Sequence, residues 1–398
     1  MESTDFSPSQ LEKGDSASSH TLDSCIKNFT PAWFAVNMGT GSVSALLYSF
    51  PYGSSPVLHV FGTAFLLLNI ILFVLFGIIS TVRYVKHPEI ISLMFNHPVQ
   101  SLYLGCVPMG FATIINASLN VHQGYGMGGR PFLYFLWGLW WFDAFISILV
   151  YFLMLYTMIT RHTHSVKALS SIWLLPAVTP VVPSTTGALL ARAITPWSAH
   201  HATITLLVSG ALLFLGLGLT FMILPLYTLR LITEGLPPNT LITSKFIPVG
   251  PCGQGGAAFL IIGQVFTNIS RQQVNENNLL NTAQPWLLLG TFCAFFLWTF
   301  GIWWMMLGVI SICETFRSNR PKFAVGFWGM VFPLGVYAFL TLQLAQLLDS
   351  SFFRVVATIL SLAVFALWST LAVVTVSKIL HHPEALFNAP CLEQGGPA

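Results

Sequence analysis

The chain has 398 residues, and only 7% of them are charged, against roughly 25% in soluble globular proteins. With a mean hydropathy of +0.74, it has too few charged side chains to cover the core of a soluble protein of this size. This composition therefore excludes a soluble protein. The net charge is only +3 and the sequence contains no basic block, which argues against nucleic acid as a partner.

Residues 1–28 are rich in Ser, Asp and Glu and contain no basic stretch followed by an apolar core. This pattern predicts a disordered N-terminal tail and not a signal peptide. The six cysteines are scattered along the chain without a CxxC pair. We therefore expect neither a disulfide framework nor a metal site, and no motif indicates a cofactor.

Ten stretches of the sequence are long and apolar enough to cross a bilayer, which takes about 20 residues per helix. They predict an all-α polytopic membrane protein with a transmembrane domain at residues 29–378 and a second tail at 379–398. The fifth and seventh stretches are interrupted by Pro and Gly. The stretches cover approximately residues 31–50, 58–82, 101–120, 132–159, 171–193, 202–229, 246–266, 284–313, 323–346 and 353–377.

Ten membrane-spanning helices, an even number, place both termini on the same side of the membrane. The basic residues predict which side that is. The tails and the even-numbered loops hold twelve of the 16 Lys and Arg residues. The opposite side holds only Arg130, Arg192, Arg271 and Arg354. By the positive-inside rule, both termini are expected to be cytoplasmic.

Glycine and proline recur near the middle of the odd-numbered stretches, at intervals of 69, 75, 68 and 82 residues, whereas the even-numbered stretches are smoother. Proline frees backbone groups, and freed groups must face protein or a water-filled path. The alternation predicts five helical hairpins, with broken helices around a central pore and smooth ones as its wall. The alternative is that Gly and Pro are simply common in membrane helices. The markers, with neighbours in parentheses, are Gly39 (Gly41), Pro108, Pro183, Pro251 (Pro248) and Pro333.

Small hydroxyl and amide residues are concentrated in the same broken stretches, where no Lys or Arg lies deep. Such donors are typical of a weak anion site, which can release what it binds. The alternative is that these residues hold helices together. Arg192, near the outer end of the fifth stretch, either attracts anions or extends to the membrane surface. The candidate path residues are Asn37, Thr40, Thr113, Asn116, Ser184, Thr186, Gln254 and Arg192, with Ser42, Thr179 and Thr185 beside them.

Asp143 is the single acidic residue well inside a predicted span. An intramembrane carboxylate is costly and therefore a functional candidate. Two interpretations stay open, a proton relay and a structural hydrogen-bonding role. Because Asp143 lies on a smooth stretch and would repel an anion in the pore, the sequence favours the structural role.

Several motifs resemble the tellurite-resistance/dicarboxylate transporter family, which includes the plant guard-cell slow anion channel. The first are FTPAWF at 29–34, MGTG at 38–41 and PMGFAT at 108–113. Four more stretches are most similar to the sulfite-exporting fungal members of that family. These are LYSFPY at 47–52, WWFD at 140–143, GPCGQG at 250–255 and GFWGMVFPLG at 326–335.

The resemblance implies ten helices in five hairpins with pseudo-fivefold symmetry, assembled as a homotrimer with one pore per protomer. It also implies that Phe332, just before Pro333, closes the pore. The expected function is export of sulfite or bisulfite across the plasma membrane. A proton-coupled carrier of C4-dicarboxylates such as malate is the alternative, although no pair of basic residues lies within the spans. No catalytic motif is present, so we do not expect an enzyme.

Overall fold

The computed structural model describes residues 23–53, 56–236, 244–272, 283–318, 323–383 and 386–393, and contains no strands within them. Each of the ten predicted stretches holds one helix. A short helix α4 (Glu89–Asn96) and a turn of helix α13 (Pro390–Glu393) lie outside those stretches. The ten helices are α2 (Phe34–Tyr48), α3 (Pro56–Lys86), α5 (Cys106–Tyr125), α6 (Gly129–Thr160), α7 (Leu174–Ile194), α8 (Ala199–Glu234), α9 (Val249–Gln272), α10 (Ala283–Ser318), α11 (Val331–Leu347) and α12 (Ser351–His381).

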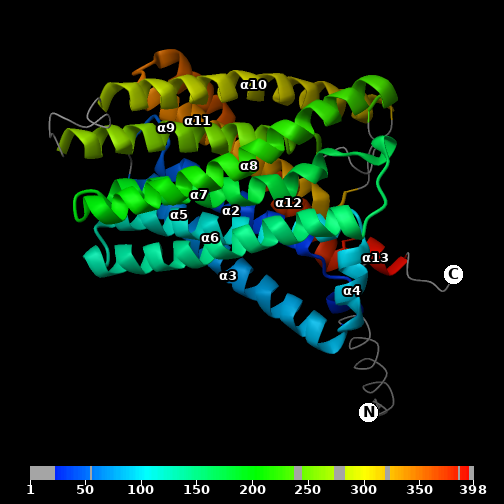
Figure 1. Ribbon diagram of the computed structural model, residues 1–398. Coiled ribbons are helices and arrows are strands. Elements are labelled where there is room, and N and C mark those ends of the chain that lie inside the picture. Colours follow the sequence, from blue (N-terminus) through cyan, green and yellow to red (C-terminus); the bar gives the residue numbers. More distant parts are fainter. Residues whose placement is uncertain are drawn as a thin grey trace, which may run out of the picture.

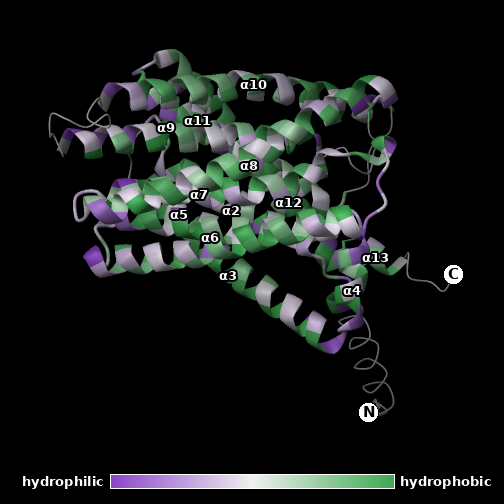
Figure 2. Cartoon of the chain, viewed as in Figure 1, coloured by the Kyte–Doolittle hydropathy of each residue, from purple (hydrophilic) through white to green (hydrophobic). Residues whose placement is uncertain are grey.

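Nine described helical segments are long and apolar enough to cross a membrane, which confirms an all-α polytopic membrane protein. The tenth helix, α2, has 15 residues and is shorter than the roughly 20 that a span needs. Most of its side chains are buried against other helices. Apolar residues cover much of the helical surface, and hydrophilic residues are more frequent towards the helix ends (Figure 2).

Most of the long helices run side by side through the molecule, whereas α3 slants away from them (Figure 1). Five helices, the ring helices, contact each other in the closed order α2, α5, α7, α9, α11 and back to α2. Five wall helices, α3, α6, α8, α10 and α12, each contact their own hairpin partner and the next ring helix. In the most apolar part of the ring segments from α5 onward, 61–94% of residues are buried, against 17–44% in the wall helices.

The bundle therefore has two different ends. At the hairpin end, each ring helix ends and the wall helix that follows it begins. At the opposite end, which we call the tail end, lie α4 and α13 (Figure 1). Every ring helix begins at the tail end with a 3₁₀ turn, formed by Pro31–Trp33, Ser101–Gly105, Ser171–Trp173, residues 244–246 and Val325–Met330.

The positions of the helix breakers differ in part from the prediction. Gly39 and Gly41 lie within α2, and Pro183 lies within α7, as expected. Three prolines instead occupy the first turn of a helix, and a fourth lies just before α9. Proline is tolerated in a first turn, because its missing N–H would have no helical partner there. These residues start helices and do not kink them; they are Pro108 in α5, Pro251 in α9, Pro333 in α11 and Pro248 before α9.

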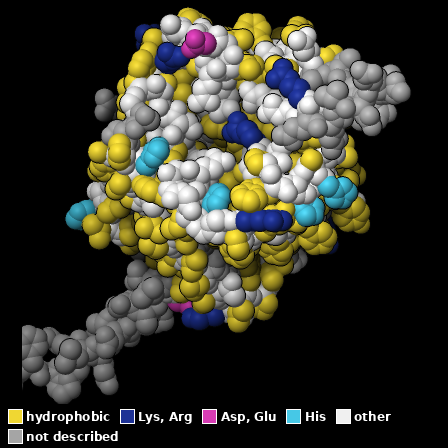
Figure 3. Space-filling model, turned by 90° about the vertical axis from the view of Figure 1, so that its left-hand side faces the viewer, with side chains coloured by type: hydrophobic (Ala, Val, Ile, Leu, Met, Phe, Trp, Pro, Cys, Tyr) yellow, Lys and Arg dark blue, Asp and Glu magenta, His cyan; other side chains and the backbone are white. Residues whose placement is uncertain are grey.

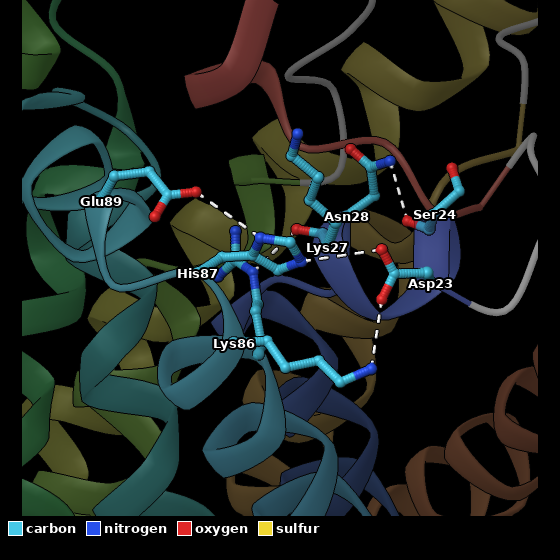
Figure 4. A network of polar contacts seen from close by, with 8 residues as sticks. Asp23, Ser24, Lys27, Asn28, Lys86, His87 and Glu89 are labelled. Carbon is cyan, nitrogen blue, oxygen red and sulfur yellow. Dashed lines mark hydrogen bonds and ion pairs between the residues drawn. The ribbon is translucent and has the colours of Figure 1, made fainter. Parts of the chain in front are cut away.

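Parts of both predicted tails pack against the tail end. Residues 23–27 form a helical turn, and Asp23 lies 3.3 Å from Lys86 and 3.8 Å from His87 at the end of α3 (Figure 4). Near the C-terminus, the ring of Phe387 stacks on Trp33 with 5.3 Å between centroids. Residues 1–22 and 394–398 lie outside the described residues.

Candidate functional site

A cavity of about 350 Å³ opens towards the hairpin end, and residues of all five ring helices line it. We call it the wide cavity. Its polar lining is Ser42, Tyr48, Ser49, His59, Thr113, Asn116, Asn120, Gln123, Thr185, Arg192, Gln254, Gln343 and Gln346, and its other lining is Gly41, Ala45, Gly124, Val182, Leu189, Phe332, Gly335, Val336 and Phe339.

A much smaller cavity of about 30 Å³, the narrow cavity, lies among the first turns of the ring helices. The lining is almost entirely apolar: Ala35, Met38, Tyr103, Cys106, Met109, Leu175, Val178, Ser244, Ile247, Gly250, Gly326, Trp328, Gly329, Phe332 and Pro333.

Phe332 is the one described residue that lines both cavities. It is the second residue of α11 and is only 4% exposed. The neighbouring Pro333 lines the narrow cavity but not the wide one. The aromatic ring of Phe332 therefore stands between a wide polar space and a narrow apolar one.

The lining of the wide cavity carries a positive charge and no negative one. Arg192 is its only Lys or Arg, and no Asp or Glu is among the described lining residues. Helix N-termini carry partial positive charge, and the ring helices start around the narrow cavity. Both halves of the path therefore favour an anion over a cation.

Two hydrogen bonds join ring helices α7 and α9 beside the wide cavity. The hydroxyl of Thr185 donates to the carbonyl oxygen of Gln254 over 3.0 Å, and the Gln254 side chain donates to the carbonyl oxygen of Val182 over 3.4 Å. These bonds fix the position of the Gln254 amide beside the part of α7 that contains Pro183.

A second network reaches the cavity from the wall. Asn69 of α3 is fully buried, and its Nδ2 donates to the hydroxyl oxygen of Thr113 over 3.1 Å. Nδ2 of Asn37 donates to both the Oδ1 and the carbonyl oxygen of Asn69, each at 3.1 Å. Asn69 thus ties α2 to α5 and orients a cavity hydroxyl, a role that sequence reasoning missed.

The structure divides the predicted path residues into two groups. Thr113, Asn116, Gln254 and Arg192 line the wide cavity, together with Gly41 and Phe332. The other predicted path residues line neither cavity and lie buried between helices, as the alternative interpretation held. This second group consists of Asn37, Thr40, Ser184 and Thr186.

Hydrogen bonds hold two threonines of the second group, whereas the hydroxyl of Ser184 has no hydrogen-bond partner among the described residues. The hydroxyl of Thr40 donates to the Val36 carbonyl over 2.7 Å and accepts from the Trp368 indole over 3.0 Å. The hydroxyl of Thr186 donates to the Val182 carbonyl over 3.3 Å. Thr113, which does line the wide cavity, also donates to a carbonyl one turn earlier, that of Gly110 over 2.7 Å. The two groups are therefore distinguished by the side of the helix on which they lie and not by this hydrogen bond.

Asp143 lies on wall helix α6, is 1% exposed, and lines neither cavity. Within the described part of the chain, neither of its carboxylate oxygens has a hydrogen-bond partner. Its position beside the pore and not in it agrees with the reasoning from charge repulsion.

Asn116 was predicted, but four other polar residues near the hairpin end of the wide cavity escaped the sequence prediction, namely Asn120, Gln123, Gln343 and Gln346. Their spacing carried a signal, because Asn116, Asn120 and Gln123 lie on one face of α5 at intervals of four and three residues. Phe339, Gln343 and Gln346 of α11 follow the same intervals of four and three residues, and Phe332 lies on that face seven residues before Phe339. A helical polar face in an otherwise apolar segment is the pattern that finds them.

Comparison with known proteins places this architecture in a family. Residues 28–376 match the model of the family described as voltage-dependent anion channel, of the SLAC1 type. The chain is 35% identical to the sulfite efflux pump of Trichophyton rubrum, over 92% of this chain and 95% of that protein. It is 36% identical to the sulfite efflux pump of Arthroderma otae, over 89% and 91% of the two chains.

A more distant relative is named for a different substrate. The malic acid transport protein of Schizosaccharomyces pombe is 26% identical over 90% of this chain and 80% of its own length. The family match covers nearly all the described helices, from α2 through most of α12. The chain therefore belongs to the SLAC1-type voltage-dependent anion channel family, also known as the tellurite-resistance/dicarboxylate transporter family.

Proposed function

We propose that this chain exports sulfite or bisulfite through the axial path formed by its five ring helices. The observation that carries the proposal is the wide cavity, which is polar, contains Arg192 and has no carboxylate in its described lining. Relatives named sulfite efflux pumps, at 35% and 36% identity over most of the chain, support sulfite as the anion.

The energetics of the membrane support export without a coupling ion. A membrane potential is worth about 2.3 kcal/mol per charge per 100 mV. An inside-negative cell therefore drives anions outward, and an exporter needs only a selective path with a gate. Weak binding by hydroxyls and amides suits such a path, because the anion must also leave.

In this proposal Phe332 is the gate. Its ring lies where the path narrows to about 30 Å³ within apolar walls, and an apolar constriction of this kind closes by excluding water. Thr113, Asn116, Gln254 and Arg192 would contact the passing anion in the wide cavity. Asp143 lies in the wall, outside the path of the anion.

The proposal includes the arrangement of the protein in the membrane. All ten helices, with α2 among them, cross the plasma membrane in five hairpins with pseudo-fivefold symmetry. The repeated contact order of ring and wall helices supports this arrangement. The tail end is cytoplasmic, as the basic residues indicate. Lipid surrounds a homotrimer that transports and does not catalyse a reaction, as the family resemblance implies.

The second candidate function is proton-coupled transport of malate. It is favoured by the relative named as a malic acid transport protein, and Asp143 would then be the proton carrier. Asp143→Asn distinguishes the two functions, because only a coupled carrier would lose transport in that variant. We expect sulfite efflux by Asp143→Asn to match that of the unchanged protein.

The direct test uses purified protein in liposomes loaded with sulfite, nitrate, chloride or malate, with and without a proton gradient. We expect sulfite to move down its own gradient at the same rate in both conditions. Malate movement that stops when the proton gradient is removed, without sulfite movement, would overturn the proposal in favour of the carrier.

A further inference from the structure

A third cavity of about 350 Å³ lies at the hairpin end, between α7 and α9. We call it the vestibule. Arg192 lines both the vestibule and the wide cavity, so the two spaces meet at its side chain. The vestibule is lined by Arg192, Thr195, Pro196, Val265, Asn268 and Arg271.

The two arginines of the vestibule differ from the other basic residues at this end. Arg354 lies 2.8 Å from the carboxylate of Asp349, and the guanidinium of Arg130 lies over the rings of Tyr134 and Trp197, at 5.4 and 5.7 Å. Each therefore already has a partner within the protein.

Arg192 and Arg271, in contrast, form no ion pair or hydrogen bond within the described part of the chain. The next acidic residue along the sequence, Glu276, lies outside the described residues. Figure 3 looks onto the hairpin end, and a basic side chain lies in the hollow near its centre. Two unpaired guanidiniums facing one hollow attract anions from the surrounding solution.

The chemistry of the pair selects the class of anion. Each guanidinium presents a planar fork of N–H donors that matches oxyanions. Two positive charges favour a doubly charged ligand over a singly charged one such as chloride. A space of about 350 Å³ holds several water molecules, since about 10–15 Å³ is enough for one, and therefore has room for a partly hydrated tetrahedral oxyanion.

We propose that Arg192 and Arg271 together bind a doubly charged oxyanion of the sulfate class from the external solution, and that this occupancy slows anion release from the wide cavity. The site follows from the vestibule itself, whereas its effect on transport rests on the proposed function. Because Arg192 belongs to both spaces, an anion held there stands in the path of anions that leave.

The transport test measures efflux from preloaded cells or liposomes with rising external sulfate, against gluconate at equal ionic strength. We expect sulfate to slow efflux in a saturating manner. Arg271→Gln should raise the sulfate concentration for half inhibition about tenfold, since it removes one charge-assisted contact. Arg354→Gln is the matched control, an arginine of the same face outside the vestibule, and should leave the inhibition unchanged.

A binding test without transport keeps the two proposals apart. The unfolding temperature of the purified protein should rise with sulfate more than with gluconate at equal ionic strength, because ligands stabilise the state that binds them. Arg271→Gln should lose this rise and Arg354→Gln should keep it. If that result is obtained without sulfite transport, the site stands and the proposed function fails.

Equal behaviour of Arg271→Gln and Arg354→Gln in both tests would overturn the inference. It would mean that external sulfate acts only by general screening of the outer face. Inhibition that grows linearly with sulfate and never saturates would likewise contradict a bound anion.

Discussion

The two halves of the axial path are built from the same five ring helices, yet they differ in every property that matters for transport. The wide cavity holds about 350 Å³ and a polar lining with Arg192, whereas the narrow cavity holds about 30 Å³ and an apolar one. An aromatic ring closes a path effectively only where the surrounding wall offers water no partners. The contrast indicates that anion contact belongs to the wide half and closure to the narrow half.

Close contact between the backbones of ring helices maintains the structure of both halves of the path. A substitution that separates two ring helices should therefore have the largest effect on stability. A Cβ at Gly253 would lie 2.6 Å from the backbone nitrogen of Tyr337, so α9 and α11 must separate in Gly253→Ala. We expect destabilisation of about 1–3 kcal/mol, at the upper end of the usual cost of overpacking because backbone is less able to yield than a side chain. Thermal unfolding of the purified variant measures it.

Gly250→Ala is the matched control for that prediction. A Cβ at Gly250 would lie 3.8 Å from the nearest atoms of Pro333, which is an ordinary contact. Comparable destabilisation of both variants would mean that the closeness of α9 and α11 is not what the glycine provides.

Removing the aromatic ring of Phe332 should abolish the separation between the wide and narrow cavities. In Phe332→Ala the wide and narrow cavities become continuous, and we expect anion flux to rise about tenfold, which corresponds to a barrier lower by about 1.4 kcal/mol. Phe339→Ala, which enlarges only the wide cavity, should change flux far less. Unchanged flux in a folded Phe332→Ala protein would contradict the gate.

The positive charge of the wide half should have a smaller effect. Arg192→Gln removes the only Lys or Arg among the described residues that line the wide cavity. We expect flux to fall about threefold at low salt, because a positive charge at the cavity raises the local anion concentration. The difference should shrink at 1 M salt, where charges are screened within about 3 Å. A salt-independent loss would indicate a structural defect.

The smallest effect concerns pH at the tail end, next to the narrow half. Nδ1 of His97 accepts the backbone N–H groups of Val99 and Gln100, each over 3.1 Å. Burial and the nearby His162 lower the pKa of His97, so the folded protein favours the neutral imidazole. Its contribution to stability is full above the ordinary histidine pKa of about 6.5 and declines as the pH falls below it.

Thermal unfolding between about pH 7.5 and about pH 5.5 tests this sign. His97→Asn should flatten the decline, because an Asn side chain accepts the same N–H groups and does not titrate. A variant whose stability declines with pH as steeply as that of the unchanged protein would show that other groups cause the decline.

The fold was predictable because the sequence patterns that indicate it are long and recur along the whole chain. Ten apolar stretches, with breakers alternating between them, indicate which helices are inside, and burial of the ring segments agrees. The position of the breakers was harder to predict. Pro108, Pro251 and Pro333 start helices after a 3₁₀ turn, and residue type alone does not distinguish a first turn from a kink.

The site was only partly predictable, because a hydroxyl in a broken helix can face either the pore or a neighbour. Thr113 faces the wide cavity, whereas Thr40 is held by Val36 and Trp368. Asn69 could not be found from its own stretch, since its partners lie 32 and 44 residues away on other helices. Such contacts depend on helix rotation, which a single sequence does not fix.

Accessibility of a cysteine on each side of Phe332 tests the central contrast most directly. Cys106 lines the narrow cavity and Ala45 the wide one. In a background without the other native cysteines, a membrane-impermeant charged thiol reagent is added outside intact cells. We predict that Ala45→Cys, in a protein with Cys106 also replaced, reacts readily, and that Cys106 alone reacts only after Phe332→Ala. Ready reaction of Cys106 with Phe332 in place would contradict the division of the path into two halves.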